Sequence, residues 1–237
     1  MSIADEGIKL YSSSLLQAVE EAGKDTLKAT GRKTKKWPNG NDLDFYLAEG
    51  PEWVRAYHKW RLNNYTEWGI WHTPDGKPAI EIGFQVDVDG TDAKLRGFID
   101  RVFENRHDGS LMVVDLKTGS SKPVSSMQLA VYAKGIKQTF GVEVTKGSYY
   151  SAREGKLQET YDLRQFPEAM IDRWVRHTHR MVTEEDFFPS VTLLCSWCGV
   201  KDHCYAWNPA IERPNFTSDI EVTWDDIIEP YDLEGDR

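Results

Sequence analysis

The chain has 237 residues, is 40% hydrophobic and carries a formal net charge of −9. Its 9 Trp, 10 Tyr and 9 Phe residues provide enough apolar material for a sizeable core, which excludes a wholly disordered chain. No apolar run approaches the roughly 18 residues of a membrane span, and Asp5 and Glu6 stand where a signal peptide carries positive charge. We therefore expect an intracellular protein.

Two helices are predicted before the first strand. Ser12–Ser14 can cap the first helix, which then carries Val19 on its apolar side. Residues 34–48 have the composition of a loop, and Pro51 suits the first turn of a second helix. Three aromatic residues recur at helical spacing within Trp53–Trp60. They either pack into the core or stack on nucleic-acid bases.

The hydrophobic period then changes from helix to strand. Apolar and polar residues alternate over residues 80–89, and turn sequences separate this run from the following ones. Further elements are predicted as strands at 95–104 and 111–119, a helix at 127–136, strands at 143–151 and 156–162, and a helix at 166–182. This order predicts an α/β fold with a central mixed sheet flanked by helices.

Acidic side chains and one lysine stand at informative places on these strands. Asp115 follows four apolar residues, so its carboxylate is costly to bury unless it is paired or bound to a metal. Lys117 shares its face, because residues two apart on a strand point the same way. Asp100 ends the run LRGFID on the neighbouring strand, and Glu81 lies on the polar face of the strand before it. Converging carboxylates favour a divalent cation, and oxygen ligands favour Mg²⁺ or Mn²⁺ over Zn²⁺.

Three short motifs follow one another in this region: GFIDR at 97–101, VVDLKTG at 113–119 and QLAVY at 128–132. Together they resemble the RecB-like branch of the PD-(D/E)XK nuclease superfamily, whose usual wording is close to G-x-I-D-R, V-x-D-[YL]-K-T-G and Q-L-x-x-Y. The match is close over residues 80–135 and holds in outline over 12–205. The resemblance implies a restriction-endonuclease-like core.

The resemblance also implies a set of catalytic residues: Lys117, Asp115, Asp100, Gln128 and Tyr132. Asp100 and Asp115 would ligate Mg²⁺ or Mn²⁺, with the backbone carbonyl of Leu116 as a further ligand. Lys117 would be the catalytic lysine. Gln128 and Tyr132 would complete the site and contact DNA.

Further ligands are implied at less conserved places of the family pattern. Glu81 stands where many members carry an additional acid. Many members also have a metal-binding histidine on a helix before the strands, and His58 lies on such a predicted helix. His72, in a predicted loop, is a second and less favoured candidate.

All three cysteines, Cys195, Cys198 and Cys204, lie within ten residues. Such spacing suits a 4Fe–4S cluster or Zn²⁺, or else the thiols pack as small apolar groups. The triplet is similar to the C-terminal end of the iron–sulfur subgroup of RecB-like nucleases, which includes AddB and the nucleases of CRISPR adaptation. That subgroup takes a fourth cysteine from its N-terminal part, and no cysteine precedes Cys195 here.

Charge is concentrated at the two ends of the chain. Residues 212–237 hold nine acids and two bases, a net of −7, so the remaining residues sum to −2. Residues 24–36 hold six bases and one acid, which either form a solvated surface or contact phosphates; the DNA-binding candidates are Arg32, Lys33, Lys35 and Lys36. We expect an N-terminal helix and basic loop at 1–48, a nuclease domain at 49–210 with the cysteine cluster at its C-terminal end, and an acidic tail at 211–237. The tail either docks a protein partner or competes with DNA for its channel.

The function expected from the motifs is metal-dependent hydrolysis of DNA, as an exonuclease in recombination, repair or phage DNA processing. Its substrate would be single-stranded DNA or duplex ends, in the cytoplasm of a bacterial or phage-infected cell, without a membrane. The alternative is a non-catalytic DNA-binding or scaffold subunit that keeps the fold. A metalloprotein built around the cysteines would leave the strand motifs unexplained.

Overall fold

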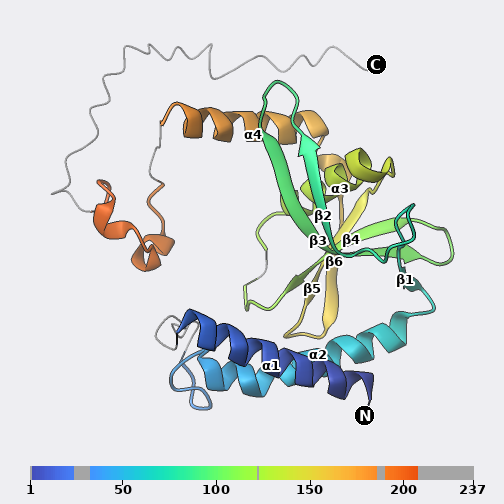
Figure 1. Ribbon diagram of the computed structural model, residues 1–237, viewed down its shortest axis with the longest axis vertical. Helices are drawn as coiled ribbons and strands as arrows, with labels where there is room; N and C mark the ends of the chain where they lie inside the picture. Colours follow the sequence, from blue (N-terminus) through green and yellow to red (C-terminus); the bar gives the residue numbers. More distant parts are fainter. Residues whose placement is uncertain (1, 24–32, 122, 186–189, 208–237) are drawn as a thin grey trace. The chain divides into compact units, whose positions relative to one another are not determined.

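The computed structural model describes residues 2–23, 33–121, 123–185 and 190–207 (Figure 1). The chain divides into two compact units, residues 1–180 and 181–237. The larger unit contains the sheet and its helices, and the expected boundary between residues 48 and 49 falls inside one of those helices. No helix of the described residues is long and apolar enough to cross a membrane.

The larger unit begins with two antiparallel helices (Figure 1). Helix α1 (Ile3–Ala22) starts at Ser2, whose hydroxyl accepts from the amide of Asp5 in a capping box. The predicted cap at Ser12–Ser14 is therefore wrong, because these serines lie inside the helix. Helix α2 (Leu43–Asn64) packs against α1 and is capped by Asp42, so that Pro51 stands inside it.

A six-stranded mixed sheet forms the centre of the unit. Its strands are β1 (Trp68–Ile70), β2 (Ile80–Asp87), β3 (Lys94–Asn105), β4 (Leu111–Lys117), β5 (Lys146–Ser151) and β6 (Lys156–Asp162). The order is β1-β3-β4-β5-β6, and β2 pairs with the other part of the long strand β3. Only the β4–β5 pair among these is parallel. The predicted mixed sheet is confirmed.

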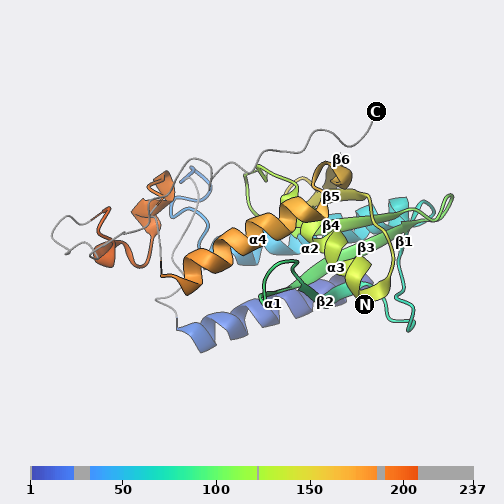
Figure 2. The same ribbon diagram turned by 90° about the horizontal axis from the view of Figure 1, so that it is seen from above.

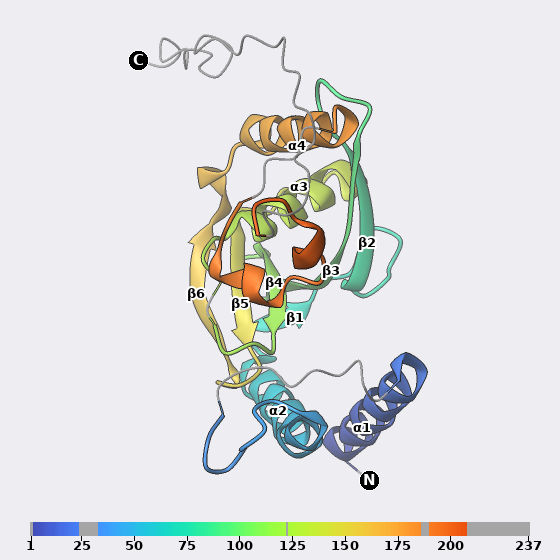
Figure 3. The ribbon, with the colours of Figure 1, turned by 90° about the vertical axis from the view of Figure 1, so that its left-hand side faces the viewer.

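Helices cover both faces of this sheet. Helix α3 (Met127–Phe140) makes the crossover between the parallel strands and ends at Gly141, whose φ of 71° suits glycine. A 3₁₀ turn (Leu163–Gln165) leads into α4 (Glu168–Thr183). In Figure 3, α3 and α4 lie on one side of the sheet and α1 and α2 on the other. Figure 2 views this arrangement from above, with α4 nearest the reader.

Each face of the sheet has its own hydrophobic core. The core beneath α3 and α4 includes the fully buried Ile99, Val113 and Ile136. The core beneath α2 is smaller and centres on Phe103 and Tyr150. The continuous burial of β4 from Leu111 to Asp115 follows from its central place between two layers of helices.

The smaller unit is described only in part. Its described residues contain two short 3₁₀ turns, Leu193–Trp197 and Lys201–His203. The first begins at Thr192, whose hydroxyl accepts from the amide of Leu194. The acidic tail predicted at residues 211–237 lies outside the described residues.

Candidate active site

The candidate site lies where strands β3 and β4 part. The two strands are paired in antiparallel register up to Arg101 and Val114. One residue further along, a carboxylate oxygen of Asp100 accepts the backbone amide of Leu116 at 2.7 Å. The side chain of Asp100 thus replaces a backbone hydrogen bond between the two strands. Beyond this point, the last residues of β4 are paired with β5 and no longer with β3.

Asp115 lies on β4 under helix α3 and is held by two side chains of that helix. Its Oδ1 accepts from Gln128 Nε2 at 3.0 Å and from the Tyr132 hydroxyl at 3.2 Å. Gln128 Nε2 also donates to the Tyr132 hydroxyl at 2.7 Å. The two residues are four apart on the helix, which places them on one face. The helix therefore closes a small polar network over the carboxylate.

Lys117 completes this network from the solvent side. Its Nζ lies 2.7 Å from Asp115 Oδ2 and donates to Gln128 Oε1 at 3.0 Å. The Lys117 side chain is 35% exposed, whereas that of Asp115 is 5% exposed. The Nζ also lies 5.6 Å from the centre of the Tyr149 ring. The Lys117 ammonium group and the exposed Gln128 are the parts of the network that a substrate in solution can reach.

Burial is the main cause of the raised pKa values of Asp115 and Tyr132. It raises the pKa of Asp115, while the neighbouring Lys117 lowers that pKa and the charge of Asp100 raises it further. Burial together with the Asp115 charge raises the pKa of Tyr132 well above its usual range, so the hydroxyl stays protonated and can donate. The influence of Asp100 on Asp115 is the mutual repulsion that a cation relieves.

The donor set fits a hard divalent cation. Asp115 Oδ2 is buried and accepts no hydrogen bond of regular geometry, although the Lys117 ammonium is within ion-pair distance. Carboxylates and a backbone carbonyl are the oxygen ligands that Mg²⁺ and Mn²⁺ prefer. No group of three His, Cys, Asp or Glu side chains suited to a metal occurs among the described residues. Remaining positions around a cation would therefore fall to the Leu116 carbonyl, water or substrate.

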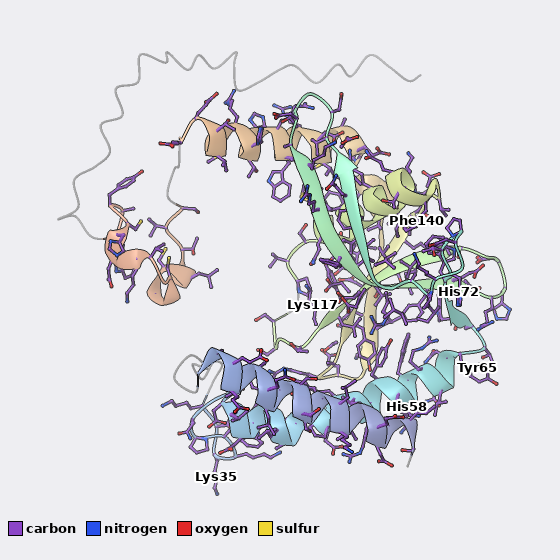
Figure 4. All side chains as sticks on the ribbon, viewed as in Figure 1. Lys35, His58, Tyr65, His72, Lys117 and Phe140 are labelled. Carbon is purple, nitrogen blue, oxygen red and sulfur yellow. The ribbon has the colours of Figure 1, made fainter. Side chains whose placement is uncertain are left out.

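Three predicted ligands lie apart from this arrangement. Glu81 is 61% exposed, adopts a φ of 51° and faces Arg101 at 3.4 Å, so it does not form a three-acid group with Asp100 and Asp115. His58 is on α2 and His72 is in the segment before β2, and Figure 4 shows both away from Lys117. The structure thus gives neither histidine a place in the site.

The predicted nucleic-acid contacts of the N-terminal region are not beside the acids either. Lys33, Lys35 and Lys36 are exposed, and Figure 4 shows Lys35 away from Lys117. Lys36 is paired with Glu49 at 2.6 Å, and Arg32 lies outside the described residues.

The aromatic residues of α2 serve the core. Tyr57 and Trp60 pack against the buried Tyr150, and Trp60 also contacts Phe103. The core interpretation is confirmed for Tyr57 and Trp60.

The cysteine triplet forms no metal-ligand group in the described residues. All three thiols are free: Cys198 is exposed, and Cys195 and Cys204 are partly buried. Cys195 Sγ accepts the backbone amide of Thr192 at 3.3 Å within the 3₁₀ turn. The thiols as placed do not fit an iron–sulfur cluster or zinc, and that site stays a prediction of the sequence alone.

One residue near the site has no signal in the sequence. Arg153, in the turn between β5 and β6, donates to the carbonyl of Thr118 at 2.7 Å, next to Lys117. Its guanidinium lies 5.2 Å from the ring centres of both Phe45 and Trp53 on α2. The arginine therefore joins the strand end that carries the lysine to the first helical layer.

Comparisons with known proteins give related results. The sequence model of the PD-(D/E)XK nuclease superfamily matches residues 6–205. A gene 69 protein of Mycobacterium phage D29 is 34% identical over 169 residues, which are 69% of this chain and 60% of that protein. The gene 69 protein of Mycobacterium phage L5 is 31% identical over 188 residues, with 69% and 62% covered. The chain thus spans less than two thirds of the length of these relatives.

Among solved structures, a protein of Eubacterium rectale described provisionally as an exonuclease aligns with 98% of this chain and 81% of its own. The sequence identity is 14% and the TM-score is 0.47. This likeness is too distant to bear on function.

Proposed function

Because the chain belongs to the PD-(D/E)XK nuclease superfamily, we propose that it is a metal-dependent deoxyribonuclease that hydrolyses phosphodiester bonds. The observation that carries the proposal is the network of Asp115, Lys117, Gln128 and Tyr132 beside Asp100. Each of these residues comes from one of the three sequence motifs, and the fold brings all of them together from β3, β4 and α3.

The residues divide the chemistry between them. A divalent cation held by Asp100, Asp115 and the Leu116 carbonyl would lower the pKa of the attacking water and offset the charge of the phosphate. Lys117, which is partly exposed, orients that water or a phosphate oxygen by donating a hydrogen bond. Gln128 bonds both Lys117 and Asp115 and so fixes the distance between the donor and the carboxylate.

The finer assignments rest on the motifs and the relatives. The order of the motifs supports the RecB-like branch, and from it an exonuclease acting on single strands or duplex ends in recombination or repair. The mycobacteriophage relatives favour phage DNA processing, in the cytoplasm of an infected bacterium, with Mg²⁺ or Mn²⁺ as the metal. A protein partner for the acidic tail belongs to the same proposal.

A cleavage assay tests the proposal. End-labelled linear single strands, blunt duplex and circular single strands are incubated with the protein and Mg²⁺ or Mn²⁺. We expect linear substrate to be degraded and circles to survive, as exonuclease action requires. Lys117→Met should slow cleavage by about 10²- to 10⁴-fold, the usual contribution of a positioned proton-transfer or hydrogen-bonding group.

The matched control is Lys59→Met, which removes an exposed lysine of α2 and should cleave like the wild type. Cleavage of circles would replace the exonuclease assignment by an endonuclease. Equal and negligible cleavage by wild type and Lys117→Met, with DNA binding retained in Ca²⁺, would instead support the non-catalytic DNA-binding subunit.

A further inference from the structure

An exposed aromatic ring lies next to the candidate metal ligands. Phe98 is on β3, two residues before Asp100, and its side chain is 68% exposed. Its partner across the β2–β3 pair is Gly83. A Cβ added at Gly83 would lie 3.3 Å from Phe98 Cε1, so the ring rests over the bare backbone of the glycine. Because Gly83 has no side chain, the ring can lie across this position, and most of the ring surface remains exposed.

The fold fixes this ring on the outside of the strand. Ile99 is completely buried in the core beneath α3, and Gly97 faces the same core, where an added Cβ would lie 2.9 Å from a ring carbon of Phe84. Successive side chains of a strand point to opposite faces. Phe98 can therefore turn inward only if the whole register slips and Ile99 is expelled. Phe98 is therefore exposed because the burial of Ile99 fixes the orientation of the strand.

Phe98 shares the outer face of β3 with an exposed cation. Arg96, two residues before it, is also exposed and pairs with Gln85 on β2. Arg96 and Phe98 are therefore neighbours on this face, about 6.6 Å apart along the strand, and Asp100 follows Phe98 two residues later in the chain. A single exposed apolar residue is ordinary on a protein surface. An exposed ring beside an exposed cation, on the strand that carries Asp100, matches the composition of a surface that binds single-stranded nucleic acid.

We propose that Phe98 stacks on an unpaired base of the DNA strand entering the site, and that Arg96 contacts a phosphate of the same strand. The proposal rests on the proposed nuclease function and specifies its substrate. Stacking on a side chain requires a free base face, which a base inside a duplex does not offer. Tyr57 and Trp60 of α2 do not compete for this role because they pack against the buried Tyr150. The substrate assigned is single-stranded DNA.

Binding measured without cleavage tests the stacking. A fluorescein-labelled oligodeoxythymidine and a blunt duplex are titrated with protein in Ca²⁺ by fluorescence anisotropy. Base–aromatic stacking contributes enough that Phe98→Ala should weaken single-strand binding by about 5- to 150-fold. Phe98→Trp should bind at least as tightly as the wild type, and Phe98→Leu should fall with the alanine variant, because leucine is apolar but not planar. Duplex binding should not change.

The control variant is Tyr65→Ala. Tyr65 is 59% exposed, follows α2 and lies away from Lys117 in Figure 4, so its loss should leave binding unchanged. Arg96→Gln should lower the slope of log affinity against log salt by about one, as expected for one lost phosphate contact. Thermal unfolding of every variant confirms that each is folded.

The outcomes separate this inference from the nuclease proposal. Unchanged single-strand affinity in both Phe98→Ala and Phe98→Leu, in a wild type that cleaves DNA, would overturn the stacking role and leave the nuclease proposal intact. Weakened binding in these variants, in a wild type that never cleaves, would support the stacking role and reject the nuclease activity. An equal loss of duplex and single-strand binding would also overturn the assignment of single-stranded DNA.

Discussion

Helices α3 and α4 are joined by an ion pair inside the protein, between Lys134 and Asp172. The two side chains are 2% and 8% exposed. Among the described residues, the only other carboxylate within ion-pair distance of Lys134 is that of Glu168, at 4.0 Å. Asp172→Asn would therefore leave a buried ammonium with one distant and half-exposed counter-charge.

The expected cost follows from this burial. Removing one partner of a buried ion pair costs about 3–5 kcal/mol, because the other charge stays desolvated. Glu168 offsets a part, so we expect about 3 kcal/mol for Asp172→Asn. For a domain of this size each kcal/mol lowers the melting temperature by about 2–4 °C, which gives a decrease of about 6–12 °C.

Urea unfolding followed by tryptophan fluorescence measures this free energy. The matched control joins the same two helices: Lys137 pairs with Glu168 at 2.6 Å, with side chains 52% and 43% exposed. Lys137→Gln should cost less than about 1 kcal/mol, as surface pairs do. The double variant Lys134→Met/Asp172→Leu should recover to within about 1 kcal/mol of the wild type. Equal effects of Asp172→Asn and Lys137→Gln would refute the reasoning from burial.

Two further substitutions probe packing close to the site. Gly135→Ala places a Cβ 2.7 Å from the ring of Phe84. Alanine ordinarily favours a helix, but we expect overpacking to lower the free energy of unfolding by about 1–3 kcal/mol. A more stable variant in thermal unfolding would contradict this. Arg153→Met removes the contacts with Thr118, Phe45 and Trp53, and we expect a loss of about 1–3 kcal/mol with a lower kcat and little change in KM. Arg153→Lys should not restore either quantity, because lysine lacks the planar fork that stacks and donates; full rescue by lysine would leave charge alone as the explanation.

The main elements of the fold and the central residues of the candidate site follow from local sequence patterns. Alternation at 111–117 places Asp115 and Lys117 on one face, and the helical spacing of Gln128 and Tyr132 aims both at them. These relations are fixed by the strand and helix periods within a few residues. The structure needs only to pack one such helix over one such strand to bring the four side chains together.

The remaining features depend on contacts between residues far apart in the chain. Glu81 is exposed, but its positive φ and its ion pair with Arg101 on the neighbouring strand have no local signal in the sequence. Pro51 was expected at a helix start because it interrupts the hydrogen bonds of a helix interior. Asp42 nevertheless starts α2 earlier, and the packing of Phe45 and Trp53 on the rings and cation around them holds the additional turns in place.

The hydrogen bond from the Leu116 amide to Asp100 has a practical consequence for capturing the protein with bound DNA. An Asp100→Ala protein would lose a candidate metal ligand and would also leave a peptide N–H without its acceptor, at a cost of about 1–3 kcal/mol. Such a protein would differ from the wild type in structure, because strands β3 and β4 lose the hydrogen bond that joins them where they diverge. Lys117→Met keeps the carboxylates of Asp100 and Asp115 and the hydrogen bond from the Leu116 amide. It is the better substrate trap for crystallisation with an oligonucleotide.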